Sequence, residues 1–208
     1  MTITVEKQGA LWRITLQRPD KANALSRAML GAIAEAYEAA AEDGEVRAIV
    51  VTGAGPRVFS GGADLSELTL ETAGDGAWQR MSRAIAAAPC LTVARINGAC
   101  LGGALTIALA CDLRIAADHA VFGYPVLRNG VMPTKGDIGR LVALAGRGSA
   151  KAILLGGARL TAAEALRAGL VEKVVAGDDL DAAVEALIAT ALAADRGHLA
   201  RLKRLADE

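Results

Sequence analysis

The sequence predicts an α/β fold in which strands and helices alternate along a single domain, residues 1–208. Short β-branched and apolar runs of strand length recur through the chain, and stretches with apolar residues at helical spacing separate them. No linker, low-complexity tract or charge block interrupts this alternation. Hydrophobic residues make up 53% of the 208 residues, which excludes intrinsic disorder and allows one well-packed core.

The first half of the chain predicts a hairpin, a capped helix and two buried strands. Residues 2–7 and 11–17 alternate around a short turn, as expected of a β-hairpin. Ser26 is expected to cap a helix that runs to about residue 41. Residues 46–52 and 91–96 are apolar runs that predict buried strands.

The other expected elements follow the same rules of capping and periodicity. Asp64 is expected to cap a short helix, and Thr161 with Glu164 forms the pattern of a capping box. The expected helices span 65–68, 77–88, 103–110, 137–145, 148–155, 161–169 and 179–193, with a further helix at the C-terminus, and the expected strands span 112–116, 120–122 and 171–175.

Charge and composition narrow the class of partner. The 23 basic and 23 acidic residues cancel, so the chain carries no electrostatic footprint for nucleic acid or an anionic membrane surface. Residues 96–111 form the longest mostly apolar stretch, which is shorter than the roughly 20 residues of a membrane helix. The first ten residues lack the pattern of a secretory signal, so a cytoplasmic protein with a small-molecule partner, or a second copy of itself, is expected.

Familiar cofactor and metal motifs do not fit. Gly53-Ala-Gly55 follows a strand, but Val58 stands where a dinucleotide fingerprint has its third glycine. The sequence has no P-loop, no GxSxG motif and no CxxC pair, and its two histidines lie far apart. No metal is expected, and the three cysteines are expected to be buried thiols.

Two glycine-rich loops carry the strongest chemical signal. Residues 59–65 (FSGGADL) follow one expected strand, and residues 97–103 (NGACLGG) follow the next. Glycine lets the main chain approach a ligand closely, and a helix start presents unpaired N–H groups. Either loop alone is an ordinary turn. Together, on neighbouring strands, the loops predict a ligand site in which two N–H groups stabilise an oxyanion, at about 3 kcal/mol per donor.

Five segments of this sequence resemble the crotonase superfamily, the enoyl-CoA hydratase/isomerase family: NAL (23–25), FSGGADLSEL (59–68), INGACLGGALTIALACDLRIAA (96–117), FGYP (122–125) and LTAAEALRAGLVEKVV (160–175). The resemblance implies a spiral of repeated ββα units that assembles as trimers or hexamers. It also implies further C-terminal helices, and because the sequence ends at Glu208, a shortened C-terminal helical region is expected. The implied substrate is an acyl-CoA thioester, as in fatty acid metabolism, with coenzyme A as part of the substrate and no permanently bound cofactor.

The resemblance also assigns roles to residues. The backbone N–H groups of Ala63 and Gly103 fall on the two donors of the family's oxyanion hole, which stabilises a thioester enolate. Thr106 and Val126 fall on the two catalytic glutamates of hydratases. The residues expected to bind coenzyme A are Lys21, Ala22, Ala24, Gly61, Gly62, Asp64, Leu65, Gly102 and Pro125.

The departures from the family pattern affect the expected reaction. Threonine does not deprotonate water at neutral pH, and valine provides neither acid nor base. Thr134 stands at a third carboxylate position, used by dienoyl isomerases and dehalogenases of the family. Hydratase activity is therefore not expected, and the remaining hypotheses are a lyase or isomerase with an unidentified acid and base, an acyl-CoA decarboxylase, or a catalytically silent binder or assembly subunit.

Several residues could replace the missing carboxylates. Asp137 is a displaced base or, more simply, the N-cap of the following helix. Tyr124 either donates a hydrogen bond to the substrate or only packs, and Lys135 either binds an acyl carboxylate or is solvated. Asp112 and His119 are expected to be structural and surface residues, respectively.

Overall fold

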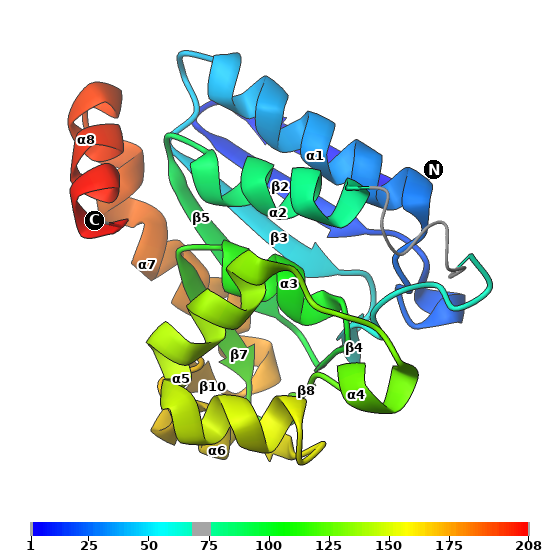
Figure 1. Ribbon diagram of the computed structural model, residues 1–208. Coiled ribbons are helices and arrows are strands. Elements are labelled where there is room, and N and C mark those ends of the chain that lie inside the picture. The colour runs from blue at the N-terminus through cyan, green and yellow to red at the C-terminus, as the bar shows by residue number, and fades with distance from the viewer. Residues whose placement is uncertain (1, 68–75, 208) are drawn as a thin grey trace.

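The computed structural model describes residues 2–67 and 76–207, which form two sheets with helices packed around them (Figure 1). The six-stranded sheet has the order β1-β2-β3-β5-β7-β10, and only β1 and β2 pair antiparallel in it. Its strands are β1 (Ile3–Gln8), β2 (Leu11–Leu16), β3 (Ala48–Gly53), β5 (Leu91–Ile96), β7 (Leu113–Ala117) and β10 (Lys173–Val175).

A second, four-stranded sheet follows the order β4-β6-β8-β9 and is built from strands of three residues. These strands are β4 (Val58–Ser60), β6 (Ala99–Leu101), β8 (Val121–Gly123) and β9 (Arg159–Thr161). Three times, a long strand of the first sheet is followed by a short strand of the second: β3 by β4, β5 by β6, and β7 by β8. A helix comes next in the chain each time, so the described residues form the spiral of repeated ββα units that the resemblance implies.

The helices cover the sheets from several sides, and α1 and α2 lie side by side on one face of the six-stranded sheet (Figure 1). The last helix lies near the starts of β5 and β7, where Lys203 contacts the Cys90 carbonyl and Asp112. The helices are α1 (Arg27–Glu42), α2 (Ala77–Ala87), α3 (Ala104–Ala110), α4 (Val126–Asn129), α5 (Lys135–Leu154), α6 (Ala162–Arg167), α7 (Leu180–Ala193) and α8 (Arg196–Asp207), with 3-10 turns η1 at Pro19–Lys21 and η3 at Gly177–Asp179.

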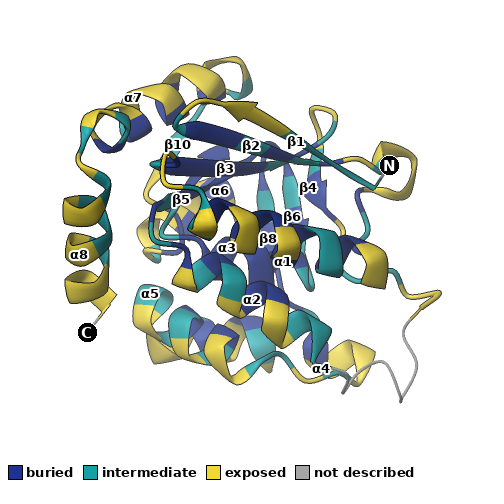
Figure 2. Cartoon of the chain, turned by 90° about the horizontal axis from the view of Figure 1, so that it is seen from above, coloured by how far each residue is buried: buried dark blue, intermediate teal, exposed yellow. Residues whose placement is uncertain are grey.

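The central strands of the six-stranded sheet are buried on both faces (Figure 2). Successive residues of β3 point to opposite faces, which sorts them into two apolar clusters. Ile49 and Val51 pack in the larger cluster with α1, α2 and α3, whereas Ala48 and Val50 pack with α7. This double burial explains why the strand reads as a continuous apolar run.

Most of the expected elements are confirmed, including the hairpin, the helix capped by Ser26 and the capping box at Thr161. The Ser26 hydroxyl accepts a hydrogen bond from the Met29 N–H at 3.3 Å. The short strands β4, β6 and β9 and the helix α4 have no clear signal in the sequence, because three or four residues are too few to show a period.

One expected helix differs from the structure, and two others share a single element. The helices expected over 137–145 and 148–155 are both present within α5, because Gly146 is non-helical, with φ 74° and ψ 163°, and separates them at a kink. The kink explains the break in helical periodicity there. The helix expected over 65–68 is not seen in its described part, since Leu65 and Ser66 form a turn and Leu68 lies outside the described residues.

The described part of the chain contains no helix long and apolar enough to cross a membrane. Cys90, Cys100 and Cys111 are buried free thiols, as expected. Burial raises the pKa of the Cys90 thiol to about 12, and Cys111 is affected in the same way, so both stay protonated at neutral pH.

One buried ion pair links β7 to the segment before β10. Arg114 is only 2% exposed, and its guanidinium donates to the carbonyls of Ala108 and Cys111 at 3.2 and 2.9 Å. It also pairs with the carboxylate of Glu172, which accepts the backbone N–H of Arg114 as well. Glu172 therefore both neutralises a buried charge and fixes the edge of the sheet.

Replacing this carboxylate should destabilise the fold. We expect Glu172→Gln to lower the free energy of unfolding by about 2 kcal/mol, because the buried Arg114 loses its counter-charge while the half-exposed position of residue 172 keeps the loss moderate. Chemical denaturation measures this. The matched control is Glu185→Gln, which removes an exposed contact to Arg13 and should change stability by less than about 0.5 kcal/mol. Equal effects would contradict the role given to Glu172.

Candidate active site

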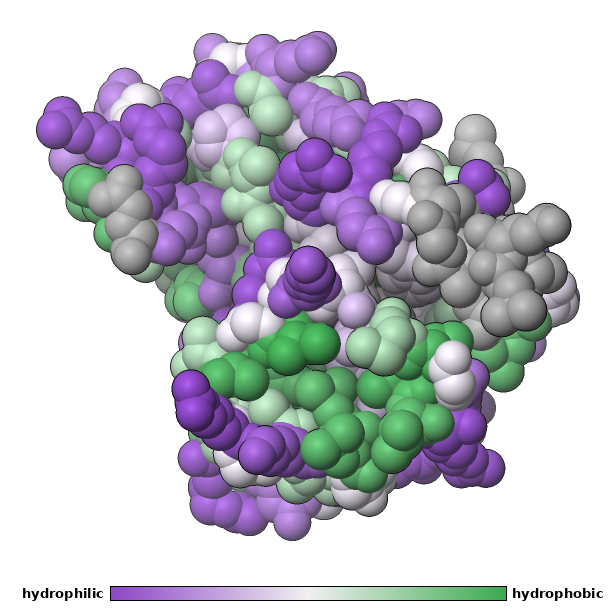
Figure 3. All heavy atoms as spheres, in the orientation of Figure 1, coloured by the Kyte–Doolittle hydropathy of each residue, from purple (hydrophilic) through white to green (hydrophobic). Residues whose placement is uncertain are grey.

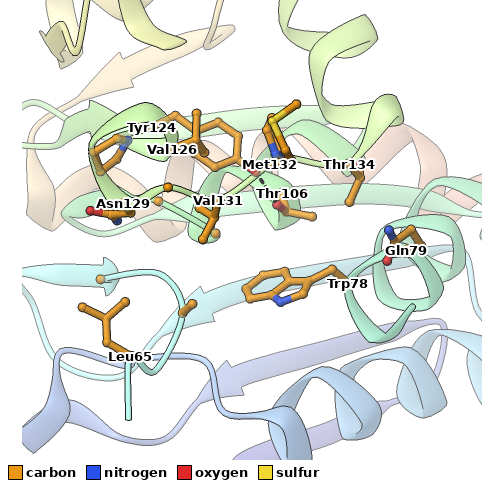
Figure 4. Close-up of a pocket in the computed structure, with 17 residues that line it drawn as sticks. Leu65, Trp78, Gln79, Thr106, Tyr124, Val126, Asn129, Val131, Met132 and Thr134 are labelled. Carbon is orange, nitrogen blue, oxygen red and sulfur yellow. Dashed lines mark hydrogen bonds between the residues drawn. The ribbon is translucent and has the colours of Figure 1, made fainter. Parts of the chain in front are cut away.

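A cavity of about 460 Å³ opens beside the two glycine-rich loops, between α2, α3 and the segment that contains α4 (Figure 4). The sequence analysis named ten of its lining residues, and the structure brings them together: Gly61, Ala63, Leu65, Gly102, Gly103, Thr106, Tyr124, Pro125, Val126 and Thr134. The others, which the sequence analysis missed, are Trp78, Gln79, Asn129, Gly130, Val131, Met132 and Pro133.

Two buried asparagines shape the loop that leads into the first glycine-rich segment. The Asn97 side chain accepts the N–H of Gly53 at 3.1 Å and donates to the Gly53 carbonyl at 3.0 Å. Asn23 donates to the carbonyls of Ala54 and Val58, both at 3.0 Å. These carboxamides bond main-chain groups at the end of β3, in the loop and at the start of β4, so the loop between β3 and β4 is held in one conformation.

Leu25 holds the first glycine-rich segment from the side. Its N–H donates to the Gly62 carbonyl at 2.7 Å, and its carbonyl accepts the Asp64 N–H at 2.9 Å. Ala63 lies between these two bonds. Because neighbouring amides of an extended chain point to opposite sides, the Ala63 N–H points away from Leu25, and it donates to no acceptor among the described residues.

The second glycine-rich segment presents a similar free amide. Gly103 precedes the first turn of α3, and its N–H has no acceptor in the described part of the chain. The Gly102 N–H, by contrast, donates to the Gly123 carbonyl at 2.8 Å. Ala63 and Gly103 both line the cavity, so two unpaired main-chain donors border the same space.

The two segments meet closely because the residue between them has no side chain. Gly62 adopts a φ of 98°, and a Cβ added there would lie 2.7 Å from the Leu101 carbonyl oxygen and 2.9 Å from the Gly103 nitrogen. Both distances are shorter than any ordinary contact. Glycine is therefore required at position 62 by its backbone conformation and by the space available.

A cluster of three oxygen-bearing side chains closes the inner end of the cavity. The Thr106 hydroxyl donates to Asp137 Oδ2 at 2.9 Å, and the Tyr124 hydroxyl donates to the same oxygen at 3.1 Å. The two hydroxyls lie 3.0 Å apart. Thr106 and Tyr124 line the cavity, whereas the Asp137 side chain is fully buried behind them.

Further donors reach the Asp137 carboxylate from α2 and α5. The Ser82 hydroxyl lies 3.4 Å from Oδ1, and Arg140 Nη1 lies 3.7 Å from the same oxygen. Arg140 also donates to Ser82 at 2.9 Å. Burial and the nearby charge of Asp137 raise the pKa of the Tyr124 hydroxyl well above its usual value, so Tyr124 remains a donor at neutral pH.

The structure corrects the expectation that Asp137 is the N-cap of the following helix. Thr134 is the N-cap, and its hydroxyl accepts the Asp137 N–H at 3.1 Å. The Asp137 side chain accepts a hydrogen bond from the Thr134 N–H at 3.3 Å, which completes a capping box. Asp137 therefore supports the helix start from the third helical position while its carboxylate faces the cluster.

The residues expected to bind coenzyme A divide into two groups. Gly61, Leu65, Gly102 and Pro125 line the cavity, but Lys21, Ala22, Ala24, Gly62 and Asp64 do not. The second group still borders the first glycine-rich segment. The Gly61 N–H donates to the Ala22 carbonyl at 2.8 Å, and Arg18 bridges the Ala24 carbonyl and Asp64 at 2.7 and 2.8 Å. Hydrogen bonds lower the pKa of the Asp64 carboxyl to about 2, and the bond from Ser66 has a larger effect than the bond from Arg18.

Apolar side chains form most of the remaining wall. Figure 4 shows the Trp78 indole reaching from α2 across the cavity toward Thr106 and Val131, with Leu65 on the opposite side. A Cβ on Gly103 would lie 2.3 Å from the Trp78 ring, so the indole rests against this glycine. Apolar residues also gather over α4 and α5 in Figure 3, where Leu127 and Met132 are exposed. The cavity therefore suits an apolar group that carries one polar end.

The other candidates lie apart from the cavity lining. Lys135 is exposed at the start of α5, as expected of a solvated lysine. His119 is exposed, and its ring nitrogen contacts the carbonyls of Pro56 and Asn97 at 3.1 and 3.2 Å, which joins two loops at the surface. Asp112 accepts the Thr92 N–H and pairs with Lys203, so its role is structural.

Comparison with known proteins identifies the family of this chain. The family model for enoyl-CoA hydratase/isomerase matches residues 6–208. This chain belongs to the enoyl-CoA hydratase/isomerase family.

Two relatives illustrate the similarity within the enoyl-CoA hydratase/isomerase family. YngF of Bacillus subtilis, whose description places it among enoyl-CoA hydratases/isomerases, is 42% identical over 183 residues, which cover 85% of this chain and 70% of YngF. The short-chain-enoyl-CoA hydratase of Clostridium acetobutylicum is 37% identical over 183 residues, which cover 86% of this chain and 70% of the relative.

A solved structure gives the same result. The enoyl-CoA hydratase from Bacillus anthracis superposes with a TM-score of 0.92 at 30% identity, covering all of this chain and 83% of the other. Two of the three proteins are named as hydratases, so the comparisons do not bear out the expectation that hydration is absent in this family member. None of the three is named as a decarboxylase, so that hypothesis gains no support from them.

The close approach of the two glycine-rich segments generates a prediction on stability. We expect Gly62→Ala to lower the free energy of unfolding by about 3 kcal/mol, because the new Cβ meets backbone atoms at an unfavourable φ. Gly55→Ala is the matched control. Gly55 also has a positive φ, 81°, but a Cβ there meets nothing within 4 Å, so the expected loss is about 1 kcal/mol. Thermal and chemical unfolding of both variants would show whether the collision at position 62 matters.

Proposed function

We propose that this protein binds an acyl-CoA thioester in the cavity and stabilises its enolate between the N–H groups of Ala63 and Gly103. The observation that supports the proposal is that both amides border the cavity without an acceptor among the described residues. A thioester α-proton is weakly acidic. Its removal becomes feasible where donors stabilise the charge that develops on the carbonyl oxygen.

The lining of the cavity supports an enzymatic role over a silent binding role. A binder needs only shape and a few anchoring contacts. Here the Thr106 and Tyr124 hydroxyls face the cavity, and both are hydrogen-bonded to a buried carboxylate. Groups of this kind move protons in enzymes, and burying a carboxylate is costly unless it is well paired.

The proposed reaction is that of a lyase or isomerase that acts on an enoyl-CoA. Both reactions pass a proton to or from the carbon next to the thioester, and both develop negative charge on the thioester oxygen. Val126 offers no proton chemistry at the second glutamate position, and Thr106 has only a hydroxyl at the first. The acid and base must therefore come from other groups that reach the cavity.

Substitution of Gly103 tests the amide pair. Gly103 has a φ of −60°, which proline adopts without strain, so Gly103→Pro removes the N–H and keeps this φ. We expect about a 100-fold slower exchange of the α-protons of butyryl-CoA with D₂O than in Gly103→Ala, measured by NMR. Gly103→Ala is the control because it introduces the same Cβ against Trp78 and keeps the donor.

A binding measurement separates the carbonyl contact from the chemistry. The absorption of a conjugated aryl-acryloyl-CoA moves to longer wavelength when its thioester oxygen accepts strong hydrogen bonds. We expect this shift with the wild-type protein and with Gly103→Ala, and a smaller shift with Gly103→Pro. If the wild-type protein causes no shift, or binds no butyryl-CoA, the proposed function is wrong.

A further inference from the structure

We propose that Asp137 is the carboxylate of this active site and that it acts through the hydroxyls of Thr106 and Tyr124. The inference rests on the proposed function, which it extends by naming a positioning residue. It begins from a feature that the amide pair does not use: a fully buried carboxylate whose two hydroxyl partners both face the cavity.

The hydrogen bonds around Asp137 leave it ready to exchange protons with the cavity. Oδ2 accepts from the two hydroxyls at 2.9 and 3.1 Å, and Oδ1 faces Ser82 and Arg140. Arg140 supplies a positive charge beside the buried carboxylate. The carboxylate therefore has a counter-charge on one side and two proton-carrying groups on the other.

A purely structural role for Asp137 explains less of this arrangement. The capping box needs only one bond to the carboxylate, from the Thr134 N–H, and that bond of 3.3 Å is longer than those from Thr106 and Tyr124. The capping box at Thr161 and Glu164 shows the ordinary form, because Glu164 serves the cap from an exposed position. The Asp137 carboxylate instead points inward, and it accepts its shortest hydrogen bonds from two side chains that line the cavity.

The arrangement allows one carboxylate to serve both halves of water addition. In the first half, the oxygen of a water molecule bonds to the β-carbon of an enoyl thioester. The water proton passes to Thr106 Oγ1, and the proton of Thr106 passes to Asp137. The electron pair of the carbon–carbon double bond moves to the thioester oxygen, which gives the enolate.

The second half restores the site. The enolate α-carbon takes the hydroxyl proton of Tyr124, and Tyr124 takes the proton held by Asp137. The double bond of the thioester carbonyl forms again, and Asp137 is once more ionised. The net change is the addition of water, so no second carboxylate, oxidant or cofactor is needed.

The same groups also account for exchange of the α-proton in a saturated thioester. Tyr124 takes that proton while its own proton moves to Asp137. After the proton on Asp137 has exchanged with solvent, the reverse relay through Tyr124 returns a solvent proton to the α-carbon. Thr106 is not needed for this reaction. Hydration therefore depends on both hydroxyls, exchange depends on Tyr124 alone, and both reactions depend on the same carboxylate.

Asp137→Asn tests the carboxylate. We expect α-proton exchange of butyryl-CoA and the kcat for crotonyl-CoA hydration to fall about 100-fold or more, while the Kd for butyryl-CoA stays within about three-fold. Asp112→Asn is the matched control, since it neutralises a partly buried, paired carboxylate far from the cavity lining and should keep both activities. The proposal is overturned if Asp137→Asn keeps both activities within about ten-fold, or loses butyryl-CoA binding together with activity.

Two variants that leave Asp137 and Arg140 in place decide the matter if Asp137→Asn does not fold. Thr106→Val should abolish hydration and keep exchange, because only the water proton passes through Thr106. Tyr124→Phe should abolish both. Equal effects of these two variants on hydration and exchange would reject the division of roles. If the wild-type protein binds and exchanges butyryl-CoA but the variants behave like it, the proposed function stands and only this inference fails.

Discussion

The close approach of the glycine-rich segments at Gly62 and Gly102–Gly103 is the constraint on which the rest of the site depends. No side chain fits between them, since a Cβ on Gly62 would lie 2.7 Å from the Leu101 carbonyl oxygen. The parallel pairing of β3 with β5 starts the two segments from neighbouring strands, and β4 and β6 continue that pairing in the second sheet. The ββα repeat thus places two free amides at the edge of one cavity.

The loops stay in this position because other groups satisfy their backbone. Asn23 and Asn97 bond the main chain of residues 53–58, and Leu25 bonds both sides of Ala63. A loop without strand partners would otherwise leave buried donors and acceptors unpaired, which is costly. The amides of Ala63 and Gly103 have no acceptor among the described residues, so they are available to a ligand oxygen.

The sequence predicts the repeated parts of this structure better than the contacts between them. The capped helix at Ser26 and the buried strands at 46–52 and 91–96 are set by local pattern, so their positions were predictable. The strands of the second sheet have three residues each and depend on tertiary pairing. Packing places Trp78 of α2 and the segment 129–133 around the cavity. Local sequence pattern does not predict this packing, so these residues could not be found from the sequence.

The position of Asp137 shows why a carboxylate beside a cavity is hard to find from aligned motifs. At the two positions where hydratases of this family carry glutamate, this chain has Thr106 and Val126, which suggests a site without a carboxylate. Yet the Thr106 hydroxyl lies 2.9 Å from a carboxylate 31 residues further along the chain. Local pattern favoured Asp137 as the N-cap, whereas the structure places Thr134 there and Asp137 at the third helical position of the same capping box. Distance in space, and not position in a motif, decides which groups can act in a site. A motif position without its glutamate therefore does not exclude acid–base chemistry when a neighbouring element places another carboxylate close by.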